Sequence, residues 1–384
     1  MLEFITQELE SLKQSGLYRT LKTIEKTEGA KVWIGGKKLV CFCSNDYLGL
    51  SNHPKVKEKT IEIIKRFGVG AGASRLISGN TIIHEELEKK IAKFKKREEA
   101  IIFPSGYMAN IGVISSLLNE KDTVIIDRLS HASIIDGCKL SKAHLQVYPH
   151  KNTHALEKVL IRSDKYKKRL IVTDSVFSMD GDIAPLPEII KLAKKYNAIT
   201  MIDEAHATGV LGENGRGVEE LFGIEGQIDI VMGTLSKAVG SLGGFVAGSS
   251  ELINYLRNKT RSFIYSTALP PSICAASIAA LYVIEGEPTL REKLWDNIKV
   301  FNTSVGSCHG MNPDIQFPII PIIIGNEEKT MKISRKLFED GIFVSGIRYP
   351  TVAKGKARLR ITITASHSKN ELKNLENLLK ICRR

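Results

Sequence analysis

The 384-residue sequence predicts an α/β protein whose mostly parallel central sheet is flanked by helices and followed by a smaller α+β domain. Between residues 55 and 265, short apolar runs alternate with segments of helical periodicity, a pattern typical of parallel strands joined by crossover helices. Polar residues follow several of these apolar runs directly. After Pro270-Pro271 the pattern changes to a long helix and a few strands. Ligands of open α/β sheets bind beyond the carboxyl ends of the strands, so we expect the functional residues there.

The composition is that of an ordinary globular protein, with 43% apolar and 25% charged residues. No apolar run reaches the roughly 20 residues that a membrane helix needs. The first ten residues carry acids where a signal peptide would be basic, so we expect a cytoplasmic protein. The cysteines are scattered and form no Cys-x-x-Cys pair, so we interpret them as free, mostly buried thiols. They are Cys41, Cys43, Cys138, Cys274, Cys308 and Cys382.

The formal net charge of +13 raises the question of nucleic-acid binding. The lysines are spread over predicted helical faces, as in residues 55–65, 89–96 and 191–195, and form no compact stripe interleaved with aromatic residues. We interpret them as a solvated surface and expect neither a nucleic-acid nor a membrane partner. A smaller basic area could serve a polyanionic substrate such as a coenzyme A ester.

The first predicted segment, residues 1–50, is helical and then forms a hairpin. Leu2, Ile5 and Leu9 have roughly helical spacing, which predicts helix over residues 1–28. Residues 31–42 predict a hairpin about Gly35-Gly36, and residues 44–50 a polar turn.

A large domain over residues 51–269 and a small one over 270–384 complete the predicted organisation. Strands of the large domain are expected at 100–103, 123–127, 145–148, 169–174, 199–203, 228–233 and 244–248, with a helix at 187–196. In the small domain we expect helices at 272–285 and 369–379 and strands at 319–324, 342–345 and 358–364.

The loop Gly233-Thr234-Leu235-Ser236-Lys237-Ala238-Val239-Gly240 is the first candidate site. Lys237 follows an apolar run in a loop of small and hydroxyl residues, where a partly neutral amine can form a Schiff base. Thr234 and Ser236 offer hydroxyls for a phosphate, and the glycines permit close backbone approach. On this octet alone, a solvated lysine in a glycine-rich turn is an equally good interpretation.

A second strand end carries Asp203 and, three residues later, His206. An acid there could keep a pyridine nitrogen protonated, as pyridoxal phosphate chemistry requires. A metal site is the alternative, but no third ligand cluster lies nearby in the sequence, so we expect no metal.

Three further strand ends carry polar residues. Ser105-Gly106-Tyr107 opens a predicted helix, whose N-terminus favours a phosphate, or is a plain strand-to-helix turn. His131 could stack on an aromatic ring or be structural, and Ser178 could contact a ring oxygen or belong to a polar turn. Acid and lysine at the ends of successive strands, with a phosphate turn beside them, together predict a pyridoxal-phosphate site.

Several longer stretches resemble the fold-type I pyridoxal-phosphate enzymes and, among these transferases, the α-oxoamine synthases, which are acyltransferases. They occur in family order over nearly the whole chain: Ser44–Leu50, Gly70–Gly79, His84–Glu88, Ser105–Asn110, Phe177–Asp182, Asp203–Gly209, Gly233–Lys237 and Arg358–Thr362.

The resemblance implies a role for each residue around pyridoxal 5'-phosphate. Lys237 would hold the cofactor as a covalent aldimine and remove the α-proton of an amino acid. Asp203 would pair with the pyridinium nitrogen and His206 with the phenolic oxygen, while His131 stacks on the ring. Residues beside the ring or its phosphate would be Ser178, Gly106, Tyr107 and Thr234.

The resemblance also implies a substrate side. Arg360 would hold the amino acid's carboxylate, for which a planar guanidinium is suited. Arg19, Asn45 and Thr351 resemble further substrate-side residues, together with His131. Family members are homodimers with interface active sites, so Ser74 and Ser266-Thr267 could belong to the neighbour's site.

Residues 130–137 and 348–352 favour one reaction within the family: condensation of L-alanine with a pimeloyl thioester, carried by coenzyme A or acyl carrier protein, in biotin biosynthesis. Tyr349 stands where that branch is expected to have proline, and a Tyr-Pro pair also occurs in sister enzymes. Condensation of glycine with acetyl-CoA to 2-amino-3-oxobutanoate is therefore the alternative. A non-catalytic partner subunit of the same fold is a third, although such subunits are expected to lack the lysine present here as Lys237.

Overall fold

The structure, a computed structural model, describes residues 2–305 and 317–382 and divides the chain into two compact units. The small unit comprises Met1–Ser44, Met179–Gly181 and Leu294–Arg384, and the large unit comprises Asn45–Ser178 and Asp182–Lys293. Each unit is described by itself.

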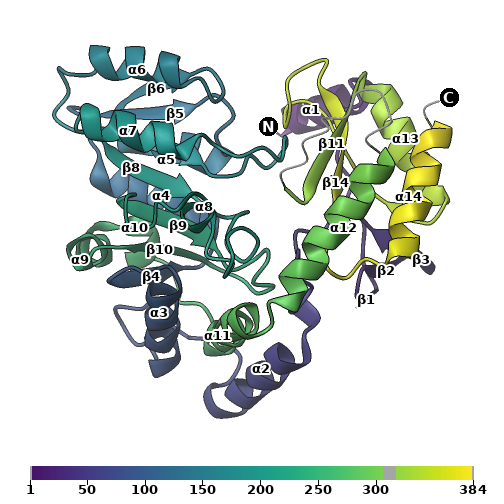
Figure 1. Ribbon diagram of the computed structural model, residues 1–384, viewed down its shortest axis with the longest axis horizontal. Helices are drawn as coiled ribbons and strands as arrows, with labels where there is room; N and C mark the ends of the chain where they lie inside the picture. The colour runs from purple at the N-terminus through teal and green to yellow at the C-terminus, as the bar shows by residue number, and fades with distance from the viewer. Residues whose placement is uncertain (1, 306–316, 383–384) are drawn as a thin grey trace. The chain divides into compact units, whose positions relative to one another are not determined.

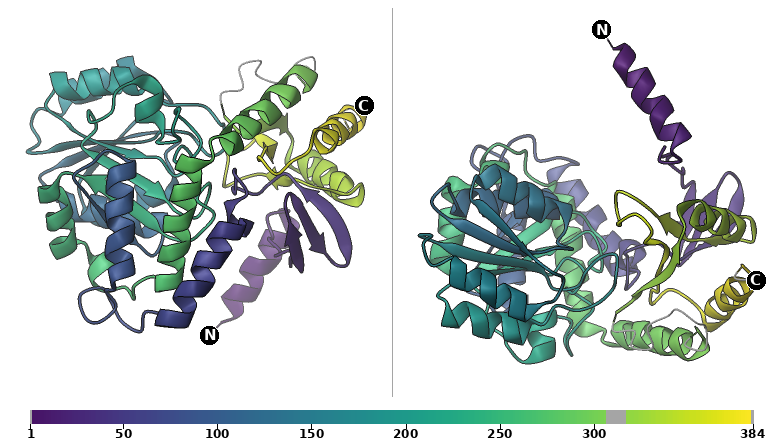
Figure 2. Two further views of the ribbon diagram at one scale, coloured as in Figure 1. Left: turned by 60° about the horizontal axis from the view of Figure 1, so that its bottom comes forward. Right: turned by 90° about the horizontal axis from the view of Figure 1, so that it is seen from above.

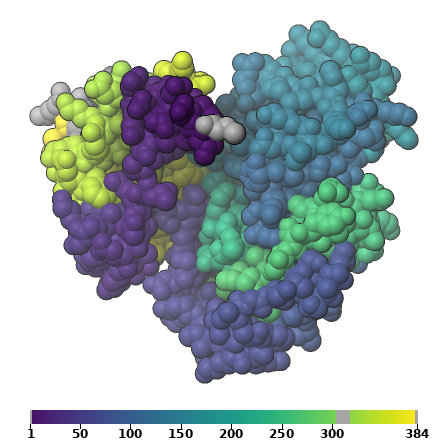
Figure 3. Space-filling view, turned by 180° about the vertical axis from the view of Figure 1, so that it is seen from behind, coloured from purple at the N-terminus to yellow at the C-terminus, as the bar shows by residue number. Residues whose placement is uncertain are grey.

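The bounds of these two units differ from the three expected ranges, 1–50, 51–269 and 270–384, for two structural reasons. The N-terminal segment groups with the C-terminal one because β3 (Lys37–Cys41) pairs in parallel with β12 (Ile342–Phe343). The helix α11 (Pro271–Gly286) groups with the large unit because it packs on α2 (Pro54–Phe67) and α3 (Ile82–Phe94). The space-filling view shows α2 beside α11 on the surface (Figure 3).

The large unit is built on a seven-stranded sheet of order β4-β10-β9-β8-β7-β5-β6 (Figure 1). Only β10 runs antiparallel to its neighbours, so the predicted mostly parallel sheet is confirmed. The strands are β4 (Glu99–Phe103), β5 (Thr123–Asp127), β6 (His144–Tyr148), β7 (Arg169–Asp174), β8 (Ile199–Asp203), β9 (Ile230–Thr234) and β10 (Gly244–Gly248).

Helices cover both faces of this sheet, which explains why the strands read as continuous apolar runs (Figure 2). Val124 and Val172 of the sheet join Val113 and Ile134 of two covering helices in one buried cluster. The remaining elements of the large unit are η1 (Leu50–Asn52), α4 (Gly106–Leu117), α5 (Ala132–Ser141), α6 (Thr153–Arg162), α7 (Leu186–Lys195), α8 (Val218–Phe222), α9 (Ser250–Lys259) and α10 (Arg261–Ile264).

The small unit has two sheets, of order β1-β2-β3-β12 and β11-β14-β13. Its other strands are β1 (Lys26–Glu28), β2 (Lys31–Ile34), β11 (Ile319–Gly325), β13 (Ser345–Ile347) and β14 (Ala357–Thr362). Its helices are α1 (Glu3–Gln14), α13 (Glu327–Glu339) and α14 (Lys369–Cys382), while α12 (Thr289–Val305) begins in the large unit and continues in the small one. The expected hairpin is confirmed, and both turn glycines, Gly35 and Gly36, have positive φ, as a two-residue turn requires.

Two expectations for the small unit were wrong. Helix over residues 1–28 ends at Gln14, because Gly16 adopts a positive φ and residues 26–28 pair with β2 instead. The single strand expected at 342–345 is split between two sheets, because Ile342 pairs with β3 and Ser345 with β14.

The solvated-surface interpretation was also wrong for two lysines. Lys90 and Lys95 lie buried at the end of α3, where Lys90 pairs with Glu285 and Lys95 with Glu204. Their partners are more than a hundred residues away in the chain, so helical periodicity gave no sign of them.

In the described part of the chain, no single helix is long and apolar enough to cross a membrane. The bent pair formed by α11 and the start of α12 meets that criterion by length and composition alone. Among the described cysteines, Cys41, Cys138 and Cys274 are buried free thiols and Cys43 is a half-buried one. Cys308 and the side chain of Cys382 lie outside the described residues.

Leu170→Ala tests the packing of the sheet. Leu170 is fully buried on β7, so the substitution should lower the free energy of unfolding by about 2–5 kcal/mol in urea denaturation. Leu140→Ala, at an exposed position of α5, is the control and should change it by less than about 0.5 kcal/mol. Equal effects of the two substitutions would contradict the packing described here.

Candidate active site

Lys237 lies in the loop between β9 and β10, at the carboxyl end of β9. Leu235 N–H donates to the carbonyl of Gly243 across the loop, at 2.9 Å. Gly240 has a φ of +69°, and a Cβ there would lie 2.3 Å from the backbone nitrogen of Ser51, so the loop needs glycine at this point. The Nζ of Lys237 lies 2.9 Å from Nε2 of His206, which holds the amine at the carboxyl edge of the sheet.

His206 connects Lys237 to a tyrosine from the other end of the sequence. Its Nδ1 lies 2.6 Å from the hydroxyl of Tyr47, a fully buried residue. The same hydroxyl lies 3.5 Å from Oδ1 of Asn45. The imidazole is therefore held at both nitrogens, which fixes its orientation beside the amine.

Asp203 ends β8, and hydrogen bonds fix its carboxylate. Oδ2 accepts from the amide of Asn110 at 2.7 Å, and Oδ1 accepts from the backbone N–H of Ala205 at 2.8 Å. The Asn110 amide also donates to Ser133 Oγ at 2.9 Å, which links β8 to α4 and α5. A buried carboxyl group held in this way presents its oxygens to a ligand in a fixed orientation.

His131 caps the N-terminus of α5, where its side chain accepts the Ser133 N–H. Although the residue is exposed as a whole, loss of solvation around its ring lowers the pKa of His131. The charge of Lys237 also lowers this pKa, whereas the charges of Asp203 and Asp136 raise it. The backbone N–H of His131 donates to Asp174 at 3.0 Å. A neutral imidazole at this position is suited to stacking on an aromatic ring.

The expected phosphate turn combines a helix N-terminus with two hydroxyls. Ser105 caps α4, and its side chain accepts the N–H of Met108 at 3.2 Å. A Cβ at Gly244 would collide with the backbone at Ser105 and Gly106, so the close approach of these segments needs glycine there. A Cβ at Gly106 would lie 2.9 Å from Cε of Met232, the end of a flexible side chain. Thr234 Oγ1 lies 2.8 Å from Ser236 Oγ, and a Cβ built at Gly106 would lie 3.5 Å from Thr234 Oγ1.

These groups fit pyridoxal phosphate. A primary amine suits its aldehyde, the Asp203 carboxylate its ring nitrogen, and the N-terminus of α4 with its glycine cradle and hydroxyls its phosphate. Tyr107 is the weakest member of the predicted set, because its hydroxyl donates to Asp136 and the residue is exposed.

Ser178 lies after β7, in a loop closed by the bridge between Val176 and Ile183. A charged histidine supports this loop: His150 contacts Asp127 at 3.0 Å and Asp182 at 2.9 Å through its two nitrogens. Burial opposes its charge, but the two carboxylates outweigh burial and raise the pKa of His150 to about 9.

The remaining predicted residues lie in the small unit. Arg360 is buried on β14, where its Nη1 donates to Thr362 Oγ1 at 3.0 Å. Arg19 and Thr351, 332 residues apart, are brought together, with Nη2 of Arg19 3.5 Å from Thr351 Oγ1. Beside them, Arg348 donates to the carbonyl of Tyr18 at 3.0 Å.

Sequence reasoning missed four polar residues that build this site: Tyr47, Asn110, Ser133 and Asp174. Each stood within or beside a stretch that carried the family resemblance, so position in those stretches was the available signal. Within the described residues, no group of three or more His, Cys, Asp and Glu side chains is arranged to hold a metal ion.

Comparison with known proteins places this chain in a family. Residues 37–378 match the family of class I and II aminotransferases. An 8-amino-7-oxononanoate synthase from Thermoanaerobacter pseudethanolicus is 52% identical over 372 residues, which cover 97% of this chain and 94% of the relative.

Solved structures agree with this placement. Serine palmitoyltransferase from S. paucimobilis, with a bound PLP–myriocin aldimine, superposes with a TM-score of 0.94 at 32% identity, covering 99% of this chain and 97% of that one. An 8-amino-7-oxononanoate synthase from Francisella tularensis superposes with a TM-score of 0.78 at 33% identity, covering 90% and 98%.

The pH dependence of stability tests the His150 contacts. Since the folded pKa of about 9 lies above the ordinary histidine pKa of 6.5, the bound proton stabilises the folded state fully below pH 6.5, and this stabilisation is lost as the pH rises through 9. His150→Gln should therefore lower the free energy of unfolding by on the order of 1–2 kcal/mol near pH 6 and by less near pH 9.5, in urea denaturation at both values. His144→Gln is the control, since that histidine stacks on Tyr166. If His150→Gln lowered the free energy of unfolding by the same amount at both pH values, the charged contacts of His150 would be ruled out.

Proposed function

Because the chain belongs to the aminotransferase class I and II family and is a pyridoxal-phosphate-dependent α-oxoamine synthase, we propose that it makes 8-amino-7-oxononanoate, a biotin precursor. The reaction joins L-alanine to a pimeloyl thioester and releases carbon dioxide and the free thiol. The observation that carries the proposal is the placement of Lys237, His206 and Asp203 at one edge of the sheet, in a chain 52% identical to a synthase of this product.

Pyridoxal phosphate, when bound, supplies an aldehyde for an amine and a ring that takes up the electron pair left at the α-carbon. We assign its attachment to Lys237, its ring nitrogen to Asp203 and its phenolic oxygen to His206. We assign its phosphate to Gly106, Thr234 and the N-terminus of α4, with Tyr107 at the margin, and its ring face to His131 and Ser178. The glycine cradle and the hydrogen-bonded carboxylate support these assignments.

Lys237 is also the base that we propose for the α-carbon of the amino acid. A base must lie within hydrogen-bond reach of the proton that it moves, and its amine must be held there. His206, itself held by Tyr47, keeps the amine of Lys237 at 2.9 Å and accepts or returns a hydrogen bond as the amine changes its charge. The same amine can return the proton at the end of the reaction.

We assign the carboxylate of the amino acid to Arg360. Its guanidinium offers several donors in a planar fork, and Thr362 occupies Nη1. We assign Arg19 and Thr351, which meet in the small unit, and Asn45, which lies beside Tyr47, to the substrates as well. Their polar side chains suit the carrier or the free carboxylate of the pimeloyl chain.

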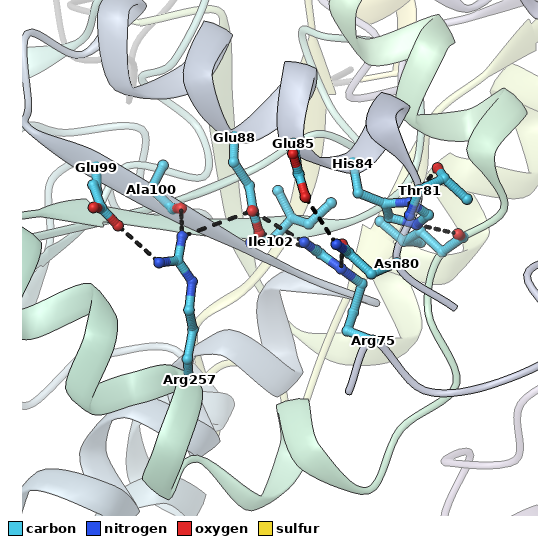
Figure 4. A network of polar contacts seen from close by, with 11 residues as sticks. Arg75, Asn80, Thr81, His84, Glu85, Glu88, Glu99, Ala100, Ile102 and Arg257 are labelled. Atoms are coloured by element: carbon cyan, nitrogen blue, oxygen red, sulfur yellow. Dashed lines mark hydrogen bonds and ion pairs between the residues drawn. The ribbon is translucent and has the colours of Figure 1, made fainter. Parts of the chain in front are cut away.

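We further propose that two copies of the chain associate through the loop at residues 68–81. Val69 and Ile77 are 78% and 80% exposed on this loop, and Leu76 and Ile82 are exposed beside them. Buried ion pairs fix the loop: Arg75 donates to both oxygens of Glu88 at 3.0 Å (Figure 4). A rigid loop that displays apolar side chains loses little entropy on docking, which favours a protein interface there.

We also propose a cytoplasmic location. The described cysteines are free thiols, and the reducing cytosol maintains that state.

The choice of substrates is tested by thiol release from the purified protein with added pyridoxal phosphate. L-alanine with pimeloyl-CoA should react with a kcat/KM at least about tenfold above that for glycine with acetyl-CoA. L-serine with palmitoyl-CoA is a third arm, chosen because of the structural similarity to serine palmitoyltransferase. Lys237→Ala, the inactive control, should lose at least about 1,000-fold in activity. Release with glycine and acetyl-CoA alone would refute the proposal.

Association is tested by light scattering coupled to size-exclusion chromatography. Ile77→Asp places a charge on the exposed loop and should convert a dimer of about twice the 42.5 kDa chain mass to the monomer. Ile161→Asp, at an exposed position of α6, is the matched control and should remain dimeric. A monomeric wild type, or a dimer that Ile77→Asp leaves intact, would exclude this interface.

A further inference from the structure

A buried ion pair lies directly behind the turn that carries Asp203 and His206. Lys95 follows the last residue of α3, and Glu204 follows the last residue of β8. Their side chains are only 2% and 1% exposed, and Nζ of Lys95 lies 2.5 Å from Oε2 of Glu204. Nothing in the proposed chemistry uses either residue directly.

Every donor of the Lys95 ammonium has an acceptor on this turn or just after it. Besides Glu204, Nζ donates to Thr208 Oγ1 at 2.9 Å and to the carbonyl of Arg216. An ammonium has three N–H donors, so these contacts use all of them. The other oxygen of Glu204 accepts the N–H of Val218 at 2.6 Å, which ties the start of α8 to the same point.

The side chains of the turn alternate between this ion pair and the cofactor site. Asp203 is bonded to Asn110, and His206 to Tyr47 and Lys237. Glu204 and Thr208, which flank His206 in the sequence, both contact Lys95 instead. The backbone that carries His206 is therefore held on both sides by one ammonium group.

The Glu204 carboxylate packs closely against Gly217. A Cβ built at Gly217, whose φ is +116°, would lie 2.1 Å from Glu204 Oε2. Buried ion pairs are weak evidence for stability, because a well-packed apolar pair of similar volume is often as stable. An apolar pair could not hold the Thr208 hydroxyl, the Arg216 carbonyl and the Val218 N–H, so geometry is what this pair specifically provides.

We propose that Lys95, acting through Glu204 and Thr208, is a positioning residue that aims Asp203 and His206 at pyridoxal phosphate. The inference rests on the proposed function, because it assigns the purpose of the turn to that cofactor. The hydrogen bonds of Lys95 go to Glu204, Thr208 and Arg216, none of which is assigned to the cofactor or the substrates.

The test compares Lys95→Met with Lys90→Met. Lys90 lies five residues earlier on the same helix, is also buried and pairs with Glu285 on α11, away from the turn. The readouts are the dissociation constant for pyridoxal phosphate, from the absorbance of the bound cofactor, and the midpoint of urea unfolding of the apoprotein. Lys95→Met should weaken cofactor binding by at least about tenfold, the effect of losing one charge-assisted hydrogen bond. Lys90→Met should change the dissociation constant for pyridoxal phosphate by less than about twofold, although both substitutions should lower the midpoint of urea unfolding.

Two further variants separate positioning from stability. In Lys95→Met/Glu204→Leu the unpaired buried carboxylate is gone, so the unfolding midpoint should recover while cofactor binding stays weak. Lys95→Arg keeps the charge and should recover part of the affinity. Recovery of both midpoint and affinity in the double variant would overturn the inference, as would wild-type affinity in Lys95→Met. A wild-type protein that takes up no pyridoxal phosphate would refute the proposed function and this inference together, an outcome that the wild-type titration alone reveals.

Discussion

The register of three parallel strands, β7, β8 and β9, determines where Asp203, His206 and Lys237 lie. Asp174 of β7 stands opposite Asp203 of β8, and Asp203 stands opposite Met232 of β9, so the residues that follow these strands emerge at one edge. Two carboxylates side by side in a buried place repel each other. Burial is the main cause that raises the pKa of Asp174 well above its usual range, and the charge of Asp203 is the next largest. The raised pKa favours the protonated form of Asp174. Neighbouring N–H groups, such as that of His131, which donates to Asp174, partly offset the cost of placing these polar groups together.

The polar groups at this edge form hydrogen-bonded chains that cross the fold. Tyr47 precedes α2, His206 follows β8 and Lys237 follows β9, yet their polar atoms are in contact. Such a chain orients each group through its neighbours, since a side chain with both polar atoms bonded has little rotational freedom. The scaffold supplies rigidity, because the strands beneath are buried and backbone hydrogen bonds, such as Leu235 N–H to the Gly243 carbonyl and Gly209 N–H to the Gly215 carbonyl, hold the loops above.

The sequence was informative where structure depends on local pattern. Strands buried on both faces appear as short apolar runs, and their bounds were predicted within about two residues. The acid, histidine and lysine of the site followed from residues that end such runs. Lys95 and Tyr47 could not be found in this way, because their roles depend on partners 109 and 159 residues away. Helix over residues 15–28 was wrong for a similar reason: strand pairing with residues 31–34 outweighs a weak apolar periodicity.

The division of residues between the two units explains why fold similarity identifies the chemistry more firmly than the substrate. Lys237, Asp203 and His206 lie in the large unit, whereas Arg360, Arg19 and Thr351 lie in the small unit. We assigned the cofactor to the first set, and enzymes that act on different acyl chains can share such a set. A serine palmitoyltransferase accordingly superposes with a TM-score of 0.94 at only 32% identity, while the 52% identical relative is an 8-amino-7-oxononanoate synthase. Under the proposed assignment of Thr351 to the substrates, selection of the acyl chain would involve Thr351 and its neighbour Tyr349, where Arg19 and Arg348 hold the N-terminal segment against this turn.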